Sequence, residues 1–248
     1  MTYNFLIAPD FAPERFAGWH MLNTLLQRHS DIGLHLLTPA SHVEQEELIA
    51  QKDISIIYAN PFDAAALIRK QGYRAIARPV GKSDEMVIAA AENSDIQCLE
   101  DIKAGSRVAM ANNRDVKLIG LRLLEAVDLT EADLNFQITE SYQAAAREVI
   151  KGEAEVAFFL ADIFAGLSKL THAQLNVLIE SDLADISHVL LVKEDFEHLE
   201  TIEKVILSLQ ELPEAQALLN ELGFERGFEA MDGESAEFMI DLMETLLD

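Results

Sequence analysis

The residues of this sequence that could do chemistry stand where short apolar runs end. The stretch IIYANPFDAA, residues 56–65, closes one such run with Tyr58 and Asn60, and Pro61 follows. Asn is a preferred N-cap, and Pro suits the first helical position, so the stretch predicts a strand that leads directly into a helix. The N–H groups of a helix start can hold an anion or a polar ligand. A cap and a buried aromatic side chain explain Tyr58 and Asn60 equally well.

Four further polar residues stand near the starts of other expected helices. Arg114 could form bidentate hydrogen bonds with a carboxylate or phosphate, or point into solvent. Ser141 could offer its hydroxyl to a ligand, or only cap its helix. Tyr142 could stack on a ligand or pack into the core. Asp162 could receive a ligand ammonium group, or cap its helix.

Histidines give no sign of a metal site. The seven are scattered, and no two have the spacing of a metal-binding pair. His42 and His188 stand near ends of expected strands, where they could contact a ligand or serve structure alone. The sequence contains no P-loop, no G-x-G-x-x-G and no G-x-S-x-G. We therefore expect no catalytic residue, no metal and no cofactor.

The charge balance narrows the possible partners. Among 248 residues, 19 are Lys or Arg and 43 are Asp or Glu, so the formal net charge is −24. Such an excess disfavours nucleic-acid and anionic membrane surfaces. No apolar run approaches the length of a membrane span, and the start lacks the features of a leader. The sequence as written predicts a cytoplasmic protein, or a periplasmic one if Met1 replaces a signal peptide. The single Cys98 excludes an internal disulfide and is expected in the core.

Strand and helix patterns alternate along most of the chain, which predicts the α/β class and a mostly parallel sheet. Ligands of such folds bind beyond the carboxyl ends of the strands, where the polar residues above are expected. After residue 193 the sequence reads as helical. The expected strands are 4–8, 33–37, 54–58, 74–78, 106–111, 135–139, 155–159, 175–179 and 188–193, with helices at 16–28, 43–50, 115–126 and 141–151.

Three stretches together resemble a known family. They are ISIIYANPFDAAALIRKQGYRAIARPVGKSDEMVIAA, SDIQCLEDIKAGSRVAMA and SYQAAAREVIKGEAEVAFFLAD, and the likeness extends over residues 5–246. They resemble the phosphate/phosphite/phosphonate-binding proteins of ABC transporters. The resemblance implies a two-lobed type 2 periplasmic-binding-protein-like α/β fold whose hinge strands contain EMVIAA and SHVLLV. Lobe 1 would comprise residues 1–82 and 188–248, lobe 2 residues 83–187, with the ligand between the lobes.

The resemblance also marks where this chain departs from the family. Members hold the anion with a Ser-Thr-Ser-Gly type turn at the start of the second lobe's first helix. Here that place reads ANNRDVKLIG, so Asn112, Asn113 and Arg114 replace the hydroxyl donors. A Ser-His pair of the family becomes Ser141 and Tyr142. Asn113 thus joins the expected ligand-binding residues, and the expected ligand is a small polar or anionic molecule.

Two hypotheses for function follow. In the first, the chain is a non-catalytic solute-binding protein that closes on a small anionic or zwitterionic ligand, phosphonate-like, phosphate-like or carboxylate-bearing. It would serve uptake, sensing or regulation, with an ABC permease or a regulatory protein as partner and without membrane insertion. In the alternative, it is a cytoplasmic enzyme of the same fold, similar to chorismate dehydratase or to enzymes of thiamin-pyrimidine synthesis.

Overall fold

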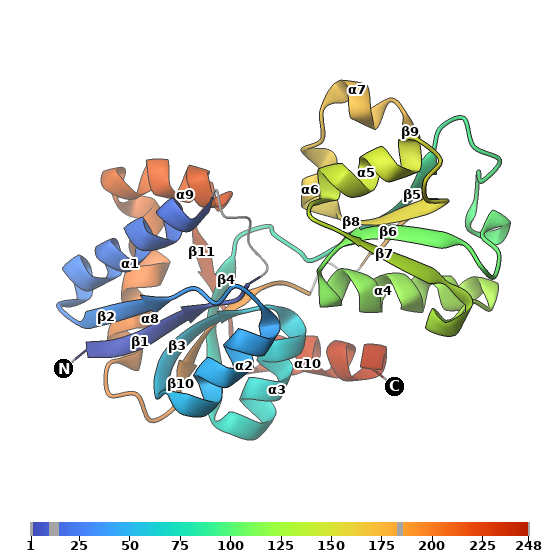
Figure 1. Ribbon diagram of the computed structural model, residues 1–248. Coiled ribbons are helices and arrows are strands. Elements are labelled where there is room, and N and C mark those ends of the chain that lie inside the picture. The colour runs from blue at the N-terminus through green and yellow to red at the C-terminus, as the bar shows by residue number, and fades with distance from the viewer. Residues whose placement is uncertain (1, 10–14, 183–185, 248) are drawn as a thin grey trace. The chain divides into compact units, whose positions relative to one another are not determined.

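The computed structural model describes residues 2–9, 15–182 and 186–247. The chain packs into two compact α/β units (Figure 1). Unit 1 consists of Met1–Ser83 and Ser187–Glu244, and unit 2 of Asp84–Ile186 and Thr245–Asp248. Packing alone defines these units. The lobes expected from the sequence therefore stay a prediction about which parts of the chain move as rigid bodies.

The strands of unit 1 are β1 (Thr2–Ile7), β2 (Gly33–Leu37), β3 (Ile54–Ala59), β4 (Tyr73–Pro79), β10 (Val189–Lys193) and β11 (Phe228–Ala230). Within the described residues they form one sheet in the order β11-β4-β10-β3-β1-β2. β1, β2 and β3 run parallel, but β10 runs against both β3 and β4. Among the described strands, β1, β2, β3 and β4 run in the same direction, as expected of a mostly parallel sheet, but β10 and β11 run against them, so the sheet is mixed. β10 enters where β3 ends, since Val189 pairs with Ala59, and so it must run the opposite way.

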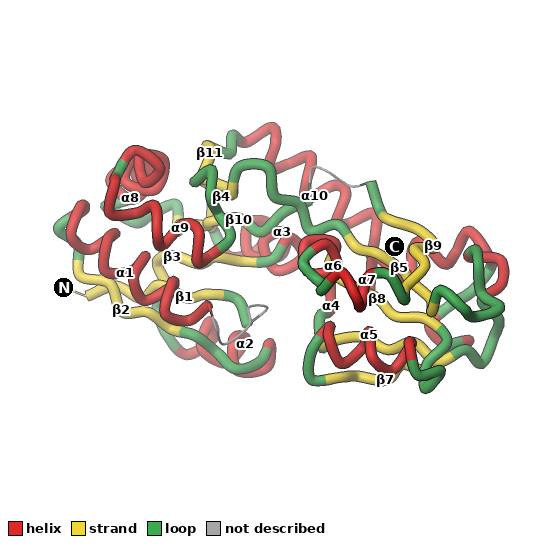
Figure 2. Tube along the Cα trace, turned by 90° about the horizontal axis from the view of Figure 1, so that it is seen from above, coloured by secondary structure: helices red, strands yellow, loops and turns green. Residues whose placement is uncertain are grey.

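Helices cover both faces of this sheet (Figure 2). They are α1 (Phe16–Ser30), α2 (His42–Gln51), α3 (Pro61–Gln71), α8 (Leu199–Ser208), α9 (Gln216–Leu222) and α10 (Gly233–Leu247). Trp19 of α1 and Leu222 of α9 bury one face, while Leu67 of α3 and Met239 of α10 bury the other. The chain after residue 193 is not all helical as expected. β11 pairs with β4 there, and three residues are too short to show a strand period.

The strands of unit 2 are β5 (Met86–Ala91), β6 (Arg107–Ala111), β7 (Asn135–Thr139), β8 (Val156–Leu160) and β9 (Leu175–Glu180). Their order in the described sheet is β7-β6-β8-β5-β9. β6 is parallel to β7 and β8, whereas β5 runs against β8 and β9, so this sheet is also mixed. The Asp84 N–H donates to the Ile186 carbonyl at 2.7 Å. The two crossing segments therefore meet just before β5 and β10, and each of those expected hinge strands pairs within a single sheet.

The helices of unit 2 are α4 (Arg114–Leu124), α5 (Tyr142–Ile150), α6 (Ala161–Ala165) and α7 (Lys169–His172), with short 3-10 helices at Leu99–Asp101, Glu125–Val127 and Glu131–Asp133. Val116 and Ile119 of α4 pack on one face of the sheet, and Ala145 and Val149 of α5 on the other. Gly120 lets α4 approach closely, because a Cβ there would lie 2.4 Å from the Phe158 ring. This packing holds α4 and α5 against the two faces of the sheet.

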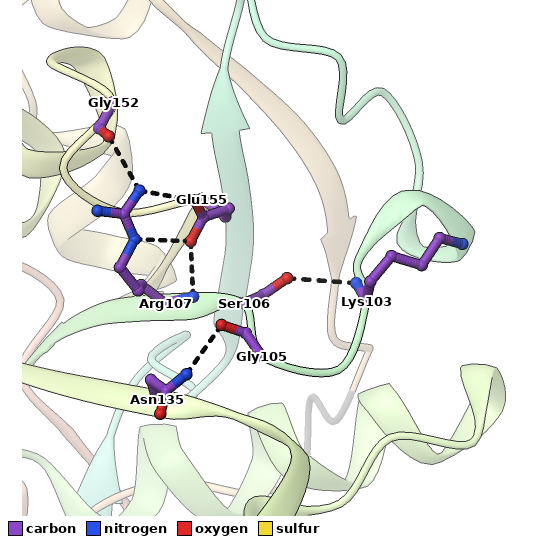
Figure 3. Close-up of polar contacts among 7 residues, drawn as sticks. All are labelled: Lys103, Gly105, Ser106, Arg107, Asn135, Gly152 and Glu155. Atoms are coloured by element: carbon purple, nitrogen blue, oxygen red, sulfur yellow. Dashed lines mark hydrogen bonds and ion pairs between the residues drawn. The ribbon is translucent and has the colours of Figure 1, made fainter.

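Polar contacts hold the amino ends of β6, β7 and β8 together (Figure 3). Arg107 donates to Glu155 from its backbone N–H at 2.7 Å, from Nε at 3.0 Å and from Nη2 at 2.7 Å. The Asn135 amide donates to the Gly105 carbonyl at 2.8 Å. These bonds fix the relative positions of the three strands at their amino ends.

Candidate ligand-binding edges

The carboxyl ends of β6, β7 and β8 lie along one edge of the unit 2 sheet, which we call the unit 2 edge. The three strands are parallel neighbours, so they end on the same side. α4, α5 and α6 each begin directly after one of them. Helix starts carry N–H groups without intrahelical acceptors and a partial positive charge. The unit 2 edge therefore gathers three such starts, and ligands of open α/β sheets bind at edges of this kind.

Two of the predicted site residues stand at the start of α4. Asn113 is its N-cap, and its Oδ1 accepts from the Val116 N–H at 3.0 Å. Arg114 is the first residue of the helix and is exposed. Within the part of the chain that the structure describes, its guanidinium has no ion-pair partner. The start of α4 thus combines a capped turn with a cation that remains available to an anion.

The start of α5 is tied to the neighbouring strand. The Ser141 hydroxyl accepts from the Ala144 N–H at 3.2 Å, so Ser141 is a cap. The Thr139 hydroxyl lies 3.1 Å from the Met110 carbonyl and 2.9 Å from the Ser141 carbonyl, which holds the end of β7 against β6. Tyr142 is half-buried, and its ring centroid lies 6.3 Å from that of Phe159. The Tyr142 ring therefore makes a packing contact with Phe159.

Asp162 does not cap its helix, and that expectation is wrong. The N-cap of α6 is Leu160, which makes no side-chain cap bond, and Asp162 lies exposed in the first turn. β8 runs on to Leu160, and the Ala161 N–H donates to the Glu85 carbonyl at 2.8 Å. The helix therefore begins at Ala161, one residue before Asp162, and the N-cap position falls on the last residue of β8.

Glu85 and Ser181 also lie at the unit 2 edge, although neither was among the residues expected at the site. Met86 pairs with Leu160 at the end of β8, which places its neighbour Glu85 there. The Ser181 hydroxyl donates to the Glu85 carboxylate and accepts from the Met86 N–H at 2.9 Å. The position of Glu85 directly before the apolar run MVIAAA was the available signal. The edge thus carries acidic groups beside its helix starts.

The matching edge of unit 1, here the unit 1 edge, lies at the carboxyl ends of β1, β2 and β3. Asn60 is 1% exposed and caps α3. Its Oδ1 accepts from the Asp63 N–H at 2.8 Å, and its Nδ2 donates to Asp63 Oδ2 at 3.0 Å. Gln45 donates to the same oxygen at 2.6 Å, and His42 Nδ1 lies 3.8 Å from it. Asn60 and His42 are thus brought together around Asp63.

Tyr58 and His188 meet at the same edge. Their rings are stacked with centroids 5.6 Å apart, and His188 is half-buried just before β10. Tyr58 is 1% exposed and also packs on Trp19 at 4.9 Å and on Phe224 at 5.8 Å. Of the two roles expected for Tyr58, core packing is the one that the geometry displays. Contact with a ligand stays a prediction for both residues.

The expectation that Cys98 lies in the core is wrong, because the side chain is exposed. Hydrogen bonds to Glu100 and Asp101 raise the pKa of its thiol, so the reactive thiolate is disfavoured. Among the described residues, no group of three or more His, Cys, Asp and Glu side chains is placed to hold a metal ion.

A family model described as the periplasmic substrate-binding protein of phosphonate ABC transporters matches residues 5–236. The chain belongs to this family. Members of the family bind substrates and do not catalyse reactions, which decides against the enzyme hypothesis. A comparison with curated protein sequences found no match. In the described part of the chain, no helix combines the length and apolar character needed to span a membrane.

Solved structures of low sequence identity share the fold. PhnD1 from Prochlorococcus marinus in complex with methylphosphonate is 12% identical, with a TM-score of 0.81 over 99% of this chain and 98% of that chain. The binding protein component of an ABC phosphonate transporter from Pseudomonas aeruginosa is 15% identical, with a TM-score of 0.75 over 100% and 89%. The alkanesulfonate-binding protein SsuA from Xanthomonas axonopodis pv. citri, bound to MOPS, is 13% identical, with a TM-score of 0.62 over 99% and 93%. The expected two-lobed periplasmic-binding-protein fold is confirmed.

Proposed function

We propose that this family member binds a small anionic or zwitterionic molecule with a phosphonate, phosphate or carboxylate group, and that its two lobes close on that molecule. The observation that carries the proposal is the unit 2 edge, where three helix starts and the exposed Arg114 gather at the carboxyl ends of adjacent strands. Helix N–H groups and a guanidinium fork both suit an oxyanion.

In this proposal the residues of the unit 2 edge have different roles in ligand binding. Arg114 forms a two-pronged contact with the anion. Asn113 and Ser141 hold the first turns of α4 and α5 in place through their caps. Tyr142 closes one side of the ligand, and Asp162 receives the ammonium group of a zwitterion. An amide or guanidinium can donate to any oxyanion, so the ligand class is broader than one anion.

From the unit 1 edge, Asn60, Tyr58, His42 and His188 complete the proposed site. The Asn60 side chain is engaged with Asp63. Pro61 has no N–H, and the Asp63 N–H is capped, so we propose that the first turn of α3 offers the Phe62 N–H to the ligand. Through this turn Asn60 supports binding without touching the ligand.

The proposed physiological role is uptake. The family serves ABC transporters from the periplasm, so we propose an ABC permease as the partner and the periplasm as the location. Supply of a ligand to a permease requires a binding protein that holds and releases its substrate unchanged, which agrees with the non-catalytic family.

Native mass spectrometry of freshly purified protein tests the proposal. The expected result is a small anionic or zwitterionic molecule retained at one copy per chain. Protein without such a molecule should gain about 2.7 kcal/mol of stability at a ligand concentration one hundred times Kd, measured as a rise in Tm. Thermal melts with phosphate, methylphosphonate, 2-aminoethylphosphonate and alanine cover the proposed class. Absence of both a retained molecule and any rise in Tm would contradict the proposal.

A further inference from the structure

A separate cavity of about 420 Å³ opens in unit 1 at the opposite end of its sheet. It is lined by residues at the amino ends of β1 and β3 and by residues at and after the carboxyl end of β10. The unit 1 edge described above lies at the other ends of the same strands. The cavity therefore belongs to no part of the proposed ligand site.

Ser55 lines this cavity although its residue is only 5% exposed. Asn4 pairs with Ile54 and Phe5 with Ile56, so Ser55 is an extra residue in β3, a bulge within a parallel pair. A bulge re-aims a side chain and is found beside binding sites. Within the described residues the Ser55 hydroxyl has no hydrogen-bond partner. Ser55 Oγ is not among the fully buried side-chain atoms that lack a partner, so the hydroxyl opens into the cavity, where a bound molecule can reach it.

Three carboxylates surround the cavity, and they outnumber its one cation. Lys193 donates to Asp53 at 2.7 Å, and the Tyr3 hydroxyl donates to Glu197. Asp195 is exposed and, among the described residues, makes no ion pair. The described lining thus carries a net negative charge, and Lys193 neutralises only part of it.

Aromatic rings form another part of the lining. Tyr3 and Phe196 meet edge to face, with ring centroids 4.9 Å apart. Aromatic faces attract organic cations, whose hydrocarbon parts also pack against them. An inorganic metal ion has less support here, because the described residues contain no group of three metal-ligating side chains placed to bind one.

We propose that this cavity binds a small organic ammonium compound. The ammonium group donates to the Ser55 hydroxyl and to the Asp195 carboxylate, which also neutralises its charge. The hydrocarbon part of the compound packs against Tyr3 and Phe196. The site would be distinct from the anion-binding edges and independent of whether those edges bind phosphonate.

Isothermal titration calorimetry with putrescine tests the site in the full chain. The expected result is saturable binding of one putrescine per chain. Ser55→Ala should weaken it about tenfold, since it removes a hydrogen bond to a charged group without changing the protein's charge. Asp195→Asn should weaken it about threefold or more through the lost charge pair. Glu46→Gln, a matched loss of one exposed carboxylate on α2, should change it less than about twofold.

Several results would overturn the proposal. Binding without saturation, or an equal loss in Glu46→Gln and Asp195→Asn, would show attraction to an acidic surface alone. Unchanged binding in a folded Ser55→Ala variant would remove the cavity from the interaction. Magnesium chloride that binds as tightly, with the same dependence on Ser55, would assign the cavity to an inorganic cation. Unchanged Tm values for the three variants verify that each one is folded.

Discussion

Asn60 uses both polar groups of its side chain within the first turn of α3. Its oxygen accepts from the Asp63 N–H, and its nitrogen donates to the Asp63 carboxylate. The YANP stretch therefore holds a helix start in place mainly through a cap, and Pro61 reinforces it at the first helical position. Asp63 in turn receives Gln45 from α2, which connects the starts of two helices.

Asn60→Ala should lower the free energy of unfolding by about 1 to 2 kcal/mol, because it removes the cap and leaves Asp63 with fewer donors. Urea denaturation measures the change. Ser41→Ala on α2, whose cap bond to Glu44 is exposed, is a matched control with an expected loss of about 0.5 to 1 kcal/mol. An Asn60→Ala variant as stable as the wild type would show that the cap bond contributes nothing measurable.

Helix α4 reaches its place at the unit 2 edge because Gly120 lets it lie close to β8. A Cβ at residue 120 would meet three atoms of the Phe158 ring within 2.9 Å. Gly120→Ala should therefore destabilise the protein by about 1 to 3 kcal/mol, although Ala is the better helix former. Gly233→Ala at the first residue of α10, where a Cβ would meet nothing within 4 Å, should be close to neutral. Thermal melts of both variants that showed equal Tm values would contradict this packing.

The contact between Arg107 and Glu155 joins β6 to the turn before β8. Hydrogen bonds from Arg107 hold the pKa of Glu155 below its ordinary value. A carboxylate with a lowered pKa in the folded protein stabilises it above the unfolded-state pKa, and that contribution is lost as the pH falls through the folded pKa. The affected window is thus the acid side, below about pH 4.5.

Arg107→Gln should destabilise the protein at pH 7 and make unfolding less dependent on pH below about pH 4.5. Denaturation with urea at a series of pH values from 3 to 7 would measure both effects. Arg74→Gln, which removes one exposed ion pair with Glu203, should change stability by less than about 1 kcal/mol. An Arg107→Gln variant with the acid dependence of the wild type would show that the bond to Glu155 adds no stability.

Junctions between strands and helices could be predicted from the sequence where a cap residue marks them. Junctions that depend on pairing with a distant strand could not. Asn60, Asn113 and Ser141 are caps because cap chemistry is local. Asp162 looked similar, but α6 begins at Ala161, directly after β8, whose last residue Leu160 pairs with Met86 of β5. The directions of β5 and β10, and the short β11, depend likewise on strands distant in sequence.

The candidate site shows the same limit. Polar residues at strand ends were identifiable, since patterns of apolar runs locate the ends. The sequence did not show which of these residues are buried. Tyr58 is buried and packs in an aromatic cluster with Trp19. Glu85 came to lie beside Ala161, the first residue of α6, only through the antiparallel entry of β5, which the sequence pattern did not reveal.

At the scale of the whole molecule, a net charge of −24 opposes the binding of anions by long-range repulsion. An anion-binding edge must therefore supply local positive potential, and in the proposed site Arg114 and three helix starts would supply it. Because exposed charge pairs are screened by salt, the contribution of Arg114 should be larger at low salt than at high salt.

Calorimetric titration of the wild type and Arg114→Ala with phosphate, methylphosphonate, 2-aminoethylphosphonate and alanine tests the central claim most directly. We expect at least one of these to bind at one copy per chain. We expect Arg114→Ala to weaken it by about 1.5 to 3 kcal/mol, and by more at low salt, with little change in stability. Arg28→Ala serves as a control, because Arg28 is an exposed arginine on α1, and this variant should bind as the wild type does. Equal affinities of Arg114→Ala and the wild type at both salt concentrations, or no binding in the whole panel, would contradict the account.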